Sequence, residues 1–357
     1  DETFQDAIAS YATAIREANL PHGEKREYIE YCFDQWLDEH EEGGFPQHFR
    51  EALWELCMTE DDYRYWRSLL RDRVDKRFDS DRLYGAKYDE DADTWRRGDL
   101  TTPADDEELL DGYTETAWLR GYVELLDRID EQAELGAILN RHYPASRHLC
   151  LRYARLLAEE GEREAAITVA EYGTEAFSGS DTIGLREVLV DQYEETDADA
   201  FRDTMIGLFV ERRDWPYYER LKATTPDDEW EHVVDTIVGR LDDRWDADTI
   251  IEIYVRENRI NDAFETVTNA RELDLFETYI DQLGDHDPAA YFDAYRREIK
   301  KAAADASRRK YYREVADHLQ TIQTLGRDRR FENLVSFLRD EYSNRPAFLD
   351  ELGKAGV

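Results

Sequence analysis

The sequence predicts an all-α protein, an array of antiparallel helix hairpins with degenerate repeats of the tetratricopeptide-like or HEAT-like α-solenoid type. Two observations predict this fold. Apolar residues recur three and four positions apart along most of the chain, which is the period of an amphipathic helix. Turn residues interrupt this pattern about every 15 to 20 residues, the length of one helix and a turn. Helices this short bury their apolar faces only by stacking in pairs, and so we expect a right-handed, curved array.

Two stretches indicate that one unit is used more than once. In "LLAEEGEREAAITVAEYGTEAF" a helix ends at Gly161 and a second helix follows, with Ala166 five residues after the turn. In "IYVRENRINDAFETVTNAREL" Asn258 takes the place of that glycine and Ala263 takes the place of that alanine. Small residues such as Gly173 would let neighbouring helices approach closely. The period is loose, which predicts degenerate hairpins.

Residues 1–78 are expected to form an N-terminal helical subdomain. In "EYIEYCFDQWLDEH" six apolar residues recur three and four positions apart and lie on one helical face: Tyr28, Ile29, Cys32, Phe33, Trp36 and Leu37. "EEGGFPQHF" then interrupts the chain with two glycines and Pro46. The next helix, "TEDDYRYWRSLL", has Thr59 as its predicted N-cap and acidic residues in its first turn.

Residues 79–112 are expected to form an acidic, loop-rich junction. In "DSDRLYGAKYDEDADTWRRGDLTTPADDEELLD" the helical period weakens, and the stretch is rich in acidic, glycine and turn residues. From Tyr113 the helices resume in short pairs, so residues 113–357 are expected to form the helical-repeat region. No stretch of the chain alternates convincingly in the manner of a half-buried strand.

The charge of the chain is extreme. Asp and Glu number 84 against 46 Lys and Arg, which gives a formal net charge of −38, while 41% of the residues are hydrophobic. The hydrophobic share is too high for a disordered chain. A dispersed acidic surface with few lysines is typical of proteins from extreme halophiles, because concentrated salt screens the self-repulsion. Adaptation to concentrated salt is therefore the favoured interpretation of the negative charge. An acidic surface with a function of its own is the less favoured interpretation.

Cysteine usage favours a reducing, cytoplasmic location. The three cysteines, Cys32, Cys57 and Cys150, are widely spaced and form no Cys-x-x-Cys pair. The sequence shows neither an apolar run that would span a membrane nor an apolar leader, and so we expect no membrane partner. Because the first residue is Asp1, we expect the chain to be part of a longer protein.

No catalytic motif stands out. The chain contains no phosphate-binding loop, no His-Glu-x-x-His, no Gly-x-Ser-x-Gly and no EF-hand loop. Within "RHYPASRHLC", His142, His148 and Cys150 are three residue types that can bind zinc. Because zinc-finger spacing and a fourth ligand are missing, capping and core packing are the favoured interpretation. We therefore assign no catalytic residue, no cofactor site and no metal ligand.

A basic island in an otherwise acidic chain is the main candidate contact surface. Residues 291–330 hold eleven Arg and Lys against six Asp and Glu. Two interpretations are open: these side chains pair with nearby acidic helices, or they receive phosphate groups or an acidic partner. The candidate contact residues of this basic island (296–330) are Arg296, Arg297, Lys300, Lys301, Arg308, Arg309, Lys310 and Arg313.

Two regions resemble a known family. "YIEYCFDQWLDEHEEGGFPQHFREALWELCMTEDDYRYWRSLL" and "YYREVADHLQTIQTLGRDRRFENLVSFLRDEYSNRPAFLDELGKAG" are similar to the helical region that follows the zinc finger in prokaryotic SWIM zinc-finger family proteins. The closing "LRDEYSNRPAFLDEL", with its Arg-Pro-apolar-Leu pattern, is the most similar part. The Cys-x-Cys of the finger does not occur here, so the resemblance implies the region C-terminal to the finger, with zinc only in an upstream finger. It also implies roles in protein interaction or in association with DNA.

Three functional hypotheses follow from these observations. The first is a non-enzymatic protein-interaction scaffold whose concave face binds a peptide or protein partner. The second is direct nucleic-acid binding through the basic island. The third, a remote alternative, is a hydrolase with an acidic metal site.

Overall fold

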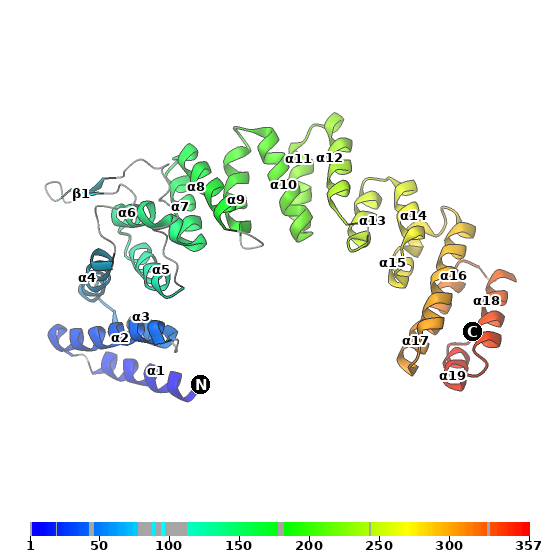
Figure 1. Ribbon diagram of the computed structural model, residues 1–357, viewed down its shortest axis with the longest axis horizontal. Helices are drawn as coiled ribbons and strands as arrows, with labels where there is room; N and C mark the ends of the chain where they lie inside the picture. Colours follow the sequence, from blue (N-terminus) through cyan, green and yellow to red (C-terminus); the bar gives the residue numbers. More distant parts are fainter. Residues whose placement is uncertain are drawn as a thin grey trace. The chain divides into compact units, whose positions relative to one another are not determined.

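The computed structural model of the protein describes residues 2–18, 20–42, 46–77, 87–89, 94–96, 113–177, 182–242, 244–326 and 329–357. In these residues the chain forms nineteen α-helices, one short 3-10 helix and one two-stranded hairpin (Figure 1). The prediction of an all-α protein is confirmed. None of the described helices is both long and apolar enough to cross a bilayer.

The chain divides into two compact units, Asp1–Leu208 and Phe209–Val357, with the boundary inside α10 (Ala198–Arg212). The first unit begins with four helices that cover the predicted N-terminal subdomain: α1 (Glu2–Glu17), α2 (His22–Glu42), α3 (Pro46–Leu56) and α4 (Glu60–Arg77). It continues with α5 (Tyr113–Arg128), α6 (Gln132–His142), the 3-10 helix η2 (Tyr143–Ala145), α7 (Arg147–Glu159), α8 (Arg163–Ala176) and α9 (Ile183–Tyr193).

The second unit consists of short helices joined by short turns. They are α11 (Trp215–Thr224), α12 (Asp227–Arg240), α13 (Ala247–Arg256), α14 (Ile260–Asn269), α15 (Leu273–Leu283), α16 (Pro288–Asp305), α17 (Arg309–Gln323), α18 (Arg329–Glu341) and α19 (Pro346–Lys354). Many helices contact the next one along the chain, and several also contact the next but one: α14 with α16, α15 with α17, α16 with α18 and α17 with α19. These contacts bury the apolar stripes that the sequence pattern predicts.

Most of the predicted junction, 79–112, lies outside the described residues. Its described part is an antiparallel hairpin of β1 (Lys87–Asp89) and β2 (Thr94–Arg96), in which Tyr88 lies opposite Trp95. The sequence pattern does not predict these two strands, because three residues are too few to show an alternation of period two.

One turn geometry recurs between helix pairs. Asp130, Gly161 and Asn258 all have positive φ, at 59°, 81° and 55°. In each case the following backbone N–H donates to the carbonyl five residues earlier, which is a Schellman closure of the preceding helix. The bonds are Glu131 to Leu126 (3.0 Å), Glu162 to Leu157 (2.8 Å) and Arg259 to Tyr254 (2.8 Å).

The predicted equivalence of Gly161 and Asn258 therefore holds at the level of the backbone. Gly and Asn are the residues that adopt left-handed φ at least cost. Ala166 and Ala263, each five residues after its turn, are both fully buried.

Close helix packing depends on small residues, as predicted for Gly173. A Cβ atom on Gly173 would lie 2.6 Å from the sulfur of Cys150 on α7 and 2.6 Å from a methyl carbon of Leu185 on α9. These distances are too short for any Cβ, and so α8 approaches both neighbours only because residue 173 has no side chain.

The predicted N-cap of α4 is also observed. The backbone N–H of Asp62 donates to the hydroxyl of Thr59 (3.3 Å), and the carboxylate of Asp62 accepts from the backbone N–H of Thr59 (3.0 Å). This reciprocal pair is a capping box. Lys25 of α2 donates to the same carboxylate at 2.6 Å, which ties α2 to the start of α4.

Candidate functional site

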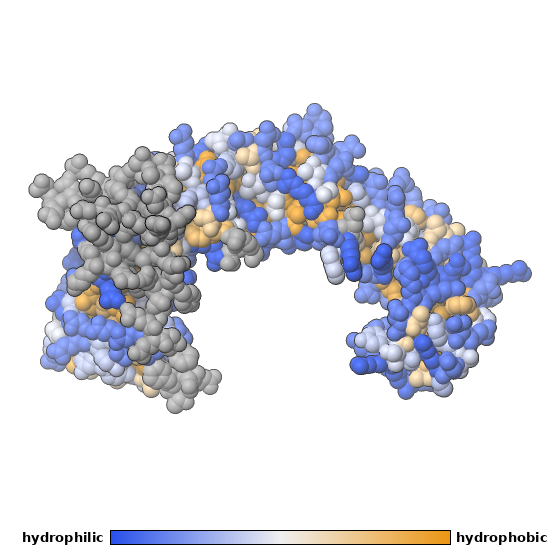
Figure 2. Space-filling view, viewed as in Figure 1, coloured by the Kyte–Doolittle hydropathy of each residue, from blue (hydrophilic) through white to orange (hydrophobic). Residues whose placement is uncertain are grey.

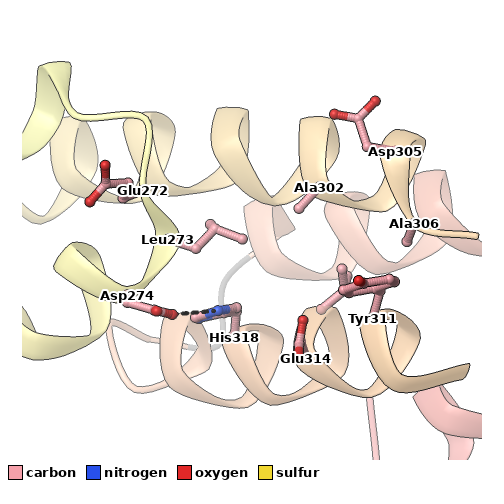
Figure 3. A pocket seen from close by; sticks show the side chains of 10 residues that line it. Glu272, Leu273, Asp274, Ala302, Asp305, Ala306, Tyr311, Glu314 and His318 are labelled. Atoms are coloured by element: carbon pink, nitrogen blue, oxygen red, sulfur yellow. Dashed lines mark ion pairs between the residues drawn. The ribbon is translucent and has the colours of Figure 1, made fainter. Parts of the chain in front are cut away.

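A pocket in the second unit is the candidate site. It lies among α15, α16 and α17 and has a volume of about 470 Å³ (Figure 3). Its apolar lining comes from all three helices and the turn between α16 and α17: Leu273, Ala302, Ala306, Tyr311 and Val315. Tyr311 is 45% exposed, so its ring is open to a bound molecule.

Carboxylates stand at the edge of this apolar lining, and in Figure 3 those of Glu272 and Asp305 point away from it. The four acidic residues of the pocket, all exposed, are Glu272, Asp274, Asp305 and Glu314. Glu314 lies 3.7 Å from Lys310. Glu272 and Asp305 form no ion pair with any other residue that the structure describes. The pocket thus combines an apolar floor with uncompensated negative charge. In Figure 2 the described surface is mainly hydrophilic, with smaller apolar patches between helices.

His318 stands at one end of the pocket, and Tyr311 and Ala306 stand at the other (Figure 3). The His318 side chain is only 8% exposed, and its Nε2 lies 3.5 Å from a carboxylate oxygen of Asp274. Its Nδ1 lies 2.8 Å from the hydroxyl of Tyr295 and 3.4 Å from a carboxylate oxygen of Glu277. Burial raises the pKa of Tyr295, so this hydroxyl stays protonated.

The local sequence explains why these side chains meet. Asp274 and Glu277 are three residues apart on α15 and therefore share one helix face. The other face of α15 carries the buried Phe276. His318 lies four residues before the buried Ile322 on the apolar face of α17. Contacts between α15 and α17 bring the two helices together.

The end of α16 that borders the pocket is fixed by α19. Arg345, the N-cap residue of α19, donates from Nη1 to the backbone oxygens of Ala303 (3.0 Å) and Ala306 (2.9 Å). Its guanidinium also stacks over the ring of Tyr342, 4.5 Å from the ring centre. The Arg-Pro motif near the C-terminal end of the sequence thus satisfies carbonyls that the end of a helix leaves free.

The basic island is largely neutralised within the second unit. Seven of its eight candidate contact residues meet a side chain of their own unit. Arg296 pairs with Asp293, Arg297 and Lys301 with Glu298, Lys310 with Glu314, and Arg309 and Arg313 with Glu351, while Lys300 lies over the ring of Phe337. Arg308 is exposed and forms no ion pair with another described residue.

Glu351 is the centre of the largest group of these pairs. It is 4% exposed and accepts from Arg309 at 2.6 Å and from Lys354 at 3.0 Å. Hydrogen bonds from Arg309 and then Lys354 hold the pKa of Glu351 at about 2. The arginines of α17 therefore serve to attach α19, as the ion-pair interpretation of the basic island expects.

His142 and Cys150 are buried in the core, whereas His148 is exposed. His142 is 1% exposed, and burial, together with the charge of Arg141, holds its pKa well below the ordinary range. Burial also raises the pKa of Cys150 to about 12. The sulfur of Cys150 lies 3.2 Å from the carbonyl oxygen of Val169. Among the described residues, the one group of potential metal ligands close enough to share an ion is Asp274, Glu277 and His318.

The sequence pattern did not single out that group. Asp274 and Glu277 form one of many acidic pairs in a chain with 84 acidic residues, and His318 is 41 residues beyond Glu277. One signal in the sequence could have pointed to His318: it is a polar residue on the otherwise apolar face of a helix.

Comparison of the chain with family models and with curated proteins finds no match.

Proposed function

We propose that the chain is a non-enzymatic protein-interaction scaffold whose C-terminal unit holds a basic side chain of a partner protein. The observation that carries this proposal is the pocket among α15, α16 and α17, with its apolar floor and its carboxylates. We also propose, from the resemblance of the two ends of the chain, that the scaffold is the helical-repeat portion of a SWIM zinc-finger protein.

The lining of the pocket matches the two parts of a lysine or arginine side chain. Ala302, Ala306 and Tyr311 provide an apolar surface for the aliphatic stem. Asp305, at the edge of the pocket, has an exposed carboxylate without an ion-pair partner among the described residues, and its side chain can rotate toward a bound cation. Tyr311 provides an aromatic face for the cation. Charge complementarity therefore favours a basic partner segment over an acidic one.

Direct nucleic-acid binding through the basic island has weaker support. Phosphate contacts need arginines and lysines that can release counterions to the backbone of the nucleic acid. Seven of the eight candidates already meet intramolecular partners. Among the described residues of this set, Arg308 alone has neither an ion pair nor a ring contact, and Lys300 has a ring contact without an ion pair.

A selection from a random peptide library displayed on phage tests the proposal. The immobilised protein is kept in concentrated potassium chloride during the selection. We expect enrichment of peptides in which Lys or Arg stands beside an apolar residue. Enrichment of acidic peptides, or no enrichment, would contradict the proposal.

Variants of exposed residues assign the binding to the pocket. The double variant Asp305→Arg and Tyr311→Ser should lose the enriched peptides, because it reverses one charge and removes the aromatic face. Trp245→Ser is the matched control: Trp245 is 75% exposed, lies in the same unit and does not line the pocket. Equal loss in both variants would show that the peptides do not bind in the pocket.

A further inference from the structure

We propose that Asp274, Glu277 and His318 form a binding site for a divalent transition-metal ion of the zinc class. Two of the three residues, Asp274 and His318, lie at the end of the pocket opposite Tyr311 (Figure 3). The site joins α15 to α17. It is a function beyond the binding of a partner's side chain.

The distances suit a shared ion. One potential ligand atom from each of the three residues lies within 4.8 Å of the other two. Two ligands on a tetrahedral zinc ion lie about 3.4 Å apart, given bond lengths of about 2.0 to 2.1 Å. The 3.5 Å between Nε2 of His318 and the Asp274 carboxylate is close to this value. The Asp274 and Glu277 side chains are 94% and 52% exposed, so both have room to rotate toward an ion.

The donor set selects the class of metal. One imidazole nitrogen and two carboxylate oxygens suit zinc, cobalt or nickel, whereas magnesium and calcium prefer oxygen ligands alone. Two carboxylates neutralise the charge of a divalent ion. Three protein ligands leave the fourth position of a tetrahedral ion open for a water molecule.

The surroundings of His318 orient its ring in the way that those of a metal-binding histidine do. Its ring is almost completely buried, and the hydroxyl of Tyr295 lies 2.8 Å from Nδ1. A hydrogen bond at one ring nitrogen orients a metal-binding histidine and fixes which nitrogen is free. When Nδ1–H donates to Tyr295, the lone pair of Nε2 points to the side where Asp274 lies. The Glu277 carboxylate lies 3.4 Å from Nδ1, and its exposed side chain must rotate to reach an ion bound at Nε2.

A plain ion pair between His318 and Asp274 is the competing explanation, and metal titration separates the two. We would titrate the full chain with zinc chloride by isothermal titration calorimetry, in concentrated potassium chloride with excess magnesium. The magnesium and the salt occupy the many exposed carboxylates, which bind divalent ions without specificity. The expected result is saturation at one zinc ion per chain. Cobalt in place of zinc should give the visible absorption of a tetrahedral site.

Four variants test the assignment. Asp274→Asn and Glu277→Gln change exposed side chains and should weaken zinc binding by more than about tenfold, and His318→Gln should abolish it. Tyr295→Phe should weaken it by roughly ten- to a hundredfold, as the loss of an orienting partner does.

Two control variants should bind zinc as the wild type does. His232→Gln removes an exposed histidine of the same unit, and Tyr311→Ser alters the far end of the pocket. Tyr311→Ser also separates this proposal from partner binding, which that residue should affect. The metal proposal would be overturned by the absence of saturable zinc binding, or by equal affinity in the wild type and in Asp274→Asn.

Discussion

Arg345 holds the end of α16 by donating a hydrogen bond to the backbone oxygen of Ala306, 2.9 Å away. The same nitrogen also donates to Ala303. Because Ala306 lines the pocket, Arg345, the N-cap residue of α19, helps to position one wall of a site that three other helices form.

Removing this contact should destabilise the second unit. Arg345→Ala leaves two helix-end carbonyls without a charged donor, and we expect the free energy of unfolding to fall by about 2 kcal/mol. Urea unfolding followed by circular dichroism measures the change. Arg308→Ala, which removes an exposed arginine without a described ion pair, should change it by less than about 0.5 kcal/mol. Equal effects of the two variants would contradict the role of Arg345.

Glu257 should make stability depend on pH. Its carboxylate accepts from Tyr218, Lys222 and Trp230, each at 2.8 Å. Burial alone would raise the pKa of Glu257, but the hydrogen bonds from these groups outweigh burial and lower it. A lowered folded-state pKa contributes stability above the ordinary glutamate pKa of about 4.3, and this contribution is lost as the pH falls through the folded-state value.

Glu257→Gln should therefore lower the free energy of unfolding by about 2 kcal/mol at neutral pH. The difference from the wild type should shrink as the pH falls below about 4. Chemical unfolding at a series of pH values measures it. Glu219→Gln, which removes an exposed partner of Arg256, should cost less than about 1 kcal/mol. If the difference in free energy of unfolding between the wild type and Glu257→Gln stays constant with pH, the lost stability does not come from hydrogen bonds to the ionised carboxylate.

The repeated turn predicts opposite effects of one substitution at two glycines. Gly161 has φ of +81° and no atom near the position of a Cβ, so Gly161→Ala should cost about 1 kcal/mol through backbone strain alone. Gly239 has equally free space but lies within α12 at ordinary helical φ. Gly239→Ala should therefore stabilise by up to about 1 kcal/mol. Thermal unfolding of both variants measures the two effects. A melting temperature that shifts in the same direction in both variants would contradict the positive φ assigned to Gly161.

The sequence pattern predicted the structural features that depend on residues close together in the chain. The helices, the N-cap at Thr59, the equivalent turns at Gly161 and Asn258, and the close packing at Gly173 all leave local signals. Each of these features is set by φ, by capping or by side-chain size, which a short stretch of sequence reveals.

Contacts between distant residues could not be predicted in this way. Glu351 neutralises Arg309 across 42 positions, and His318 meets Asp274 across 44 positions; no local pattern marks either pair. The basic island illustrates the difference, because its composition was visible in the sequence whereas its acidic partners on α19 were not.

The net charge of −38 predicts a strong dependence of stability on salt. Repulsion among exposed carboxylates should weaken the folded state in dilute buffer, because the screening length there is several times longer than in concentrated salt. We expect the melting temperature to rise steadily with potassium chloride into the multimolar range, as measured by scanning calorimetry. A melting temperature that is independent of salt, or falls with it, would contradict the halophilic interpretation of the surface.

Affinity purification tests the scaffold proposal most directly. The wild type and the double variant Asp305→Arg and Tyr311→Ser would each be used as bait in concentrated potassium chloride, with and without nuclease, and the bound proteins identified by mass spectrometry. We predict partners that the wild type retains after nuclease treatment and that the double variant loses. Partners that nuclease removes, and that the double variant still binds, would contradict the proposal and favour nucleic-acid binding through a basic surface that includes Arg308.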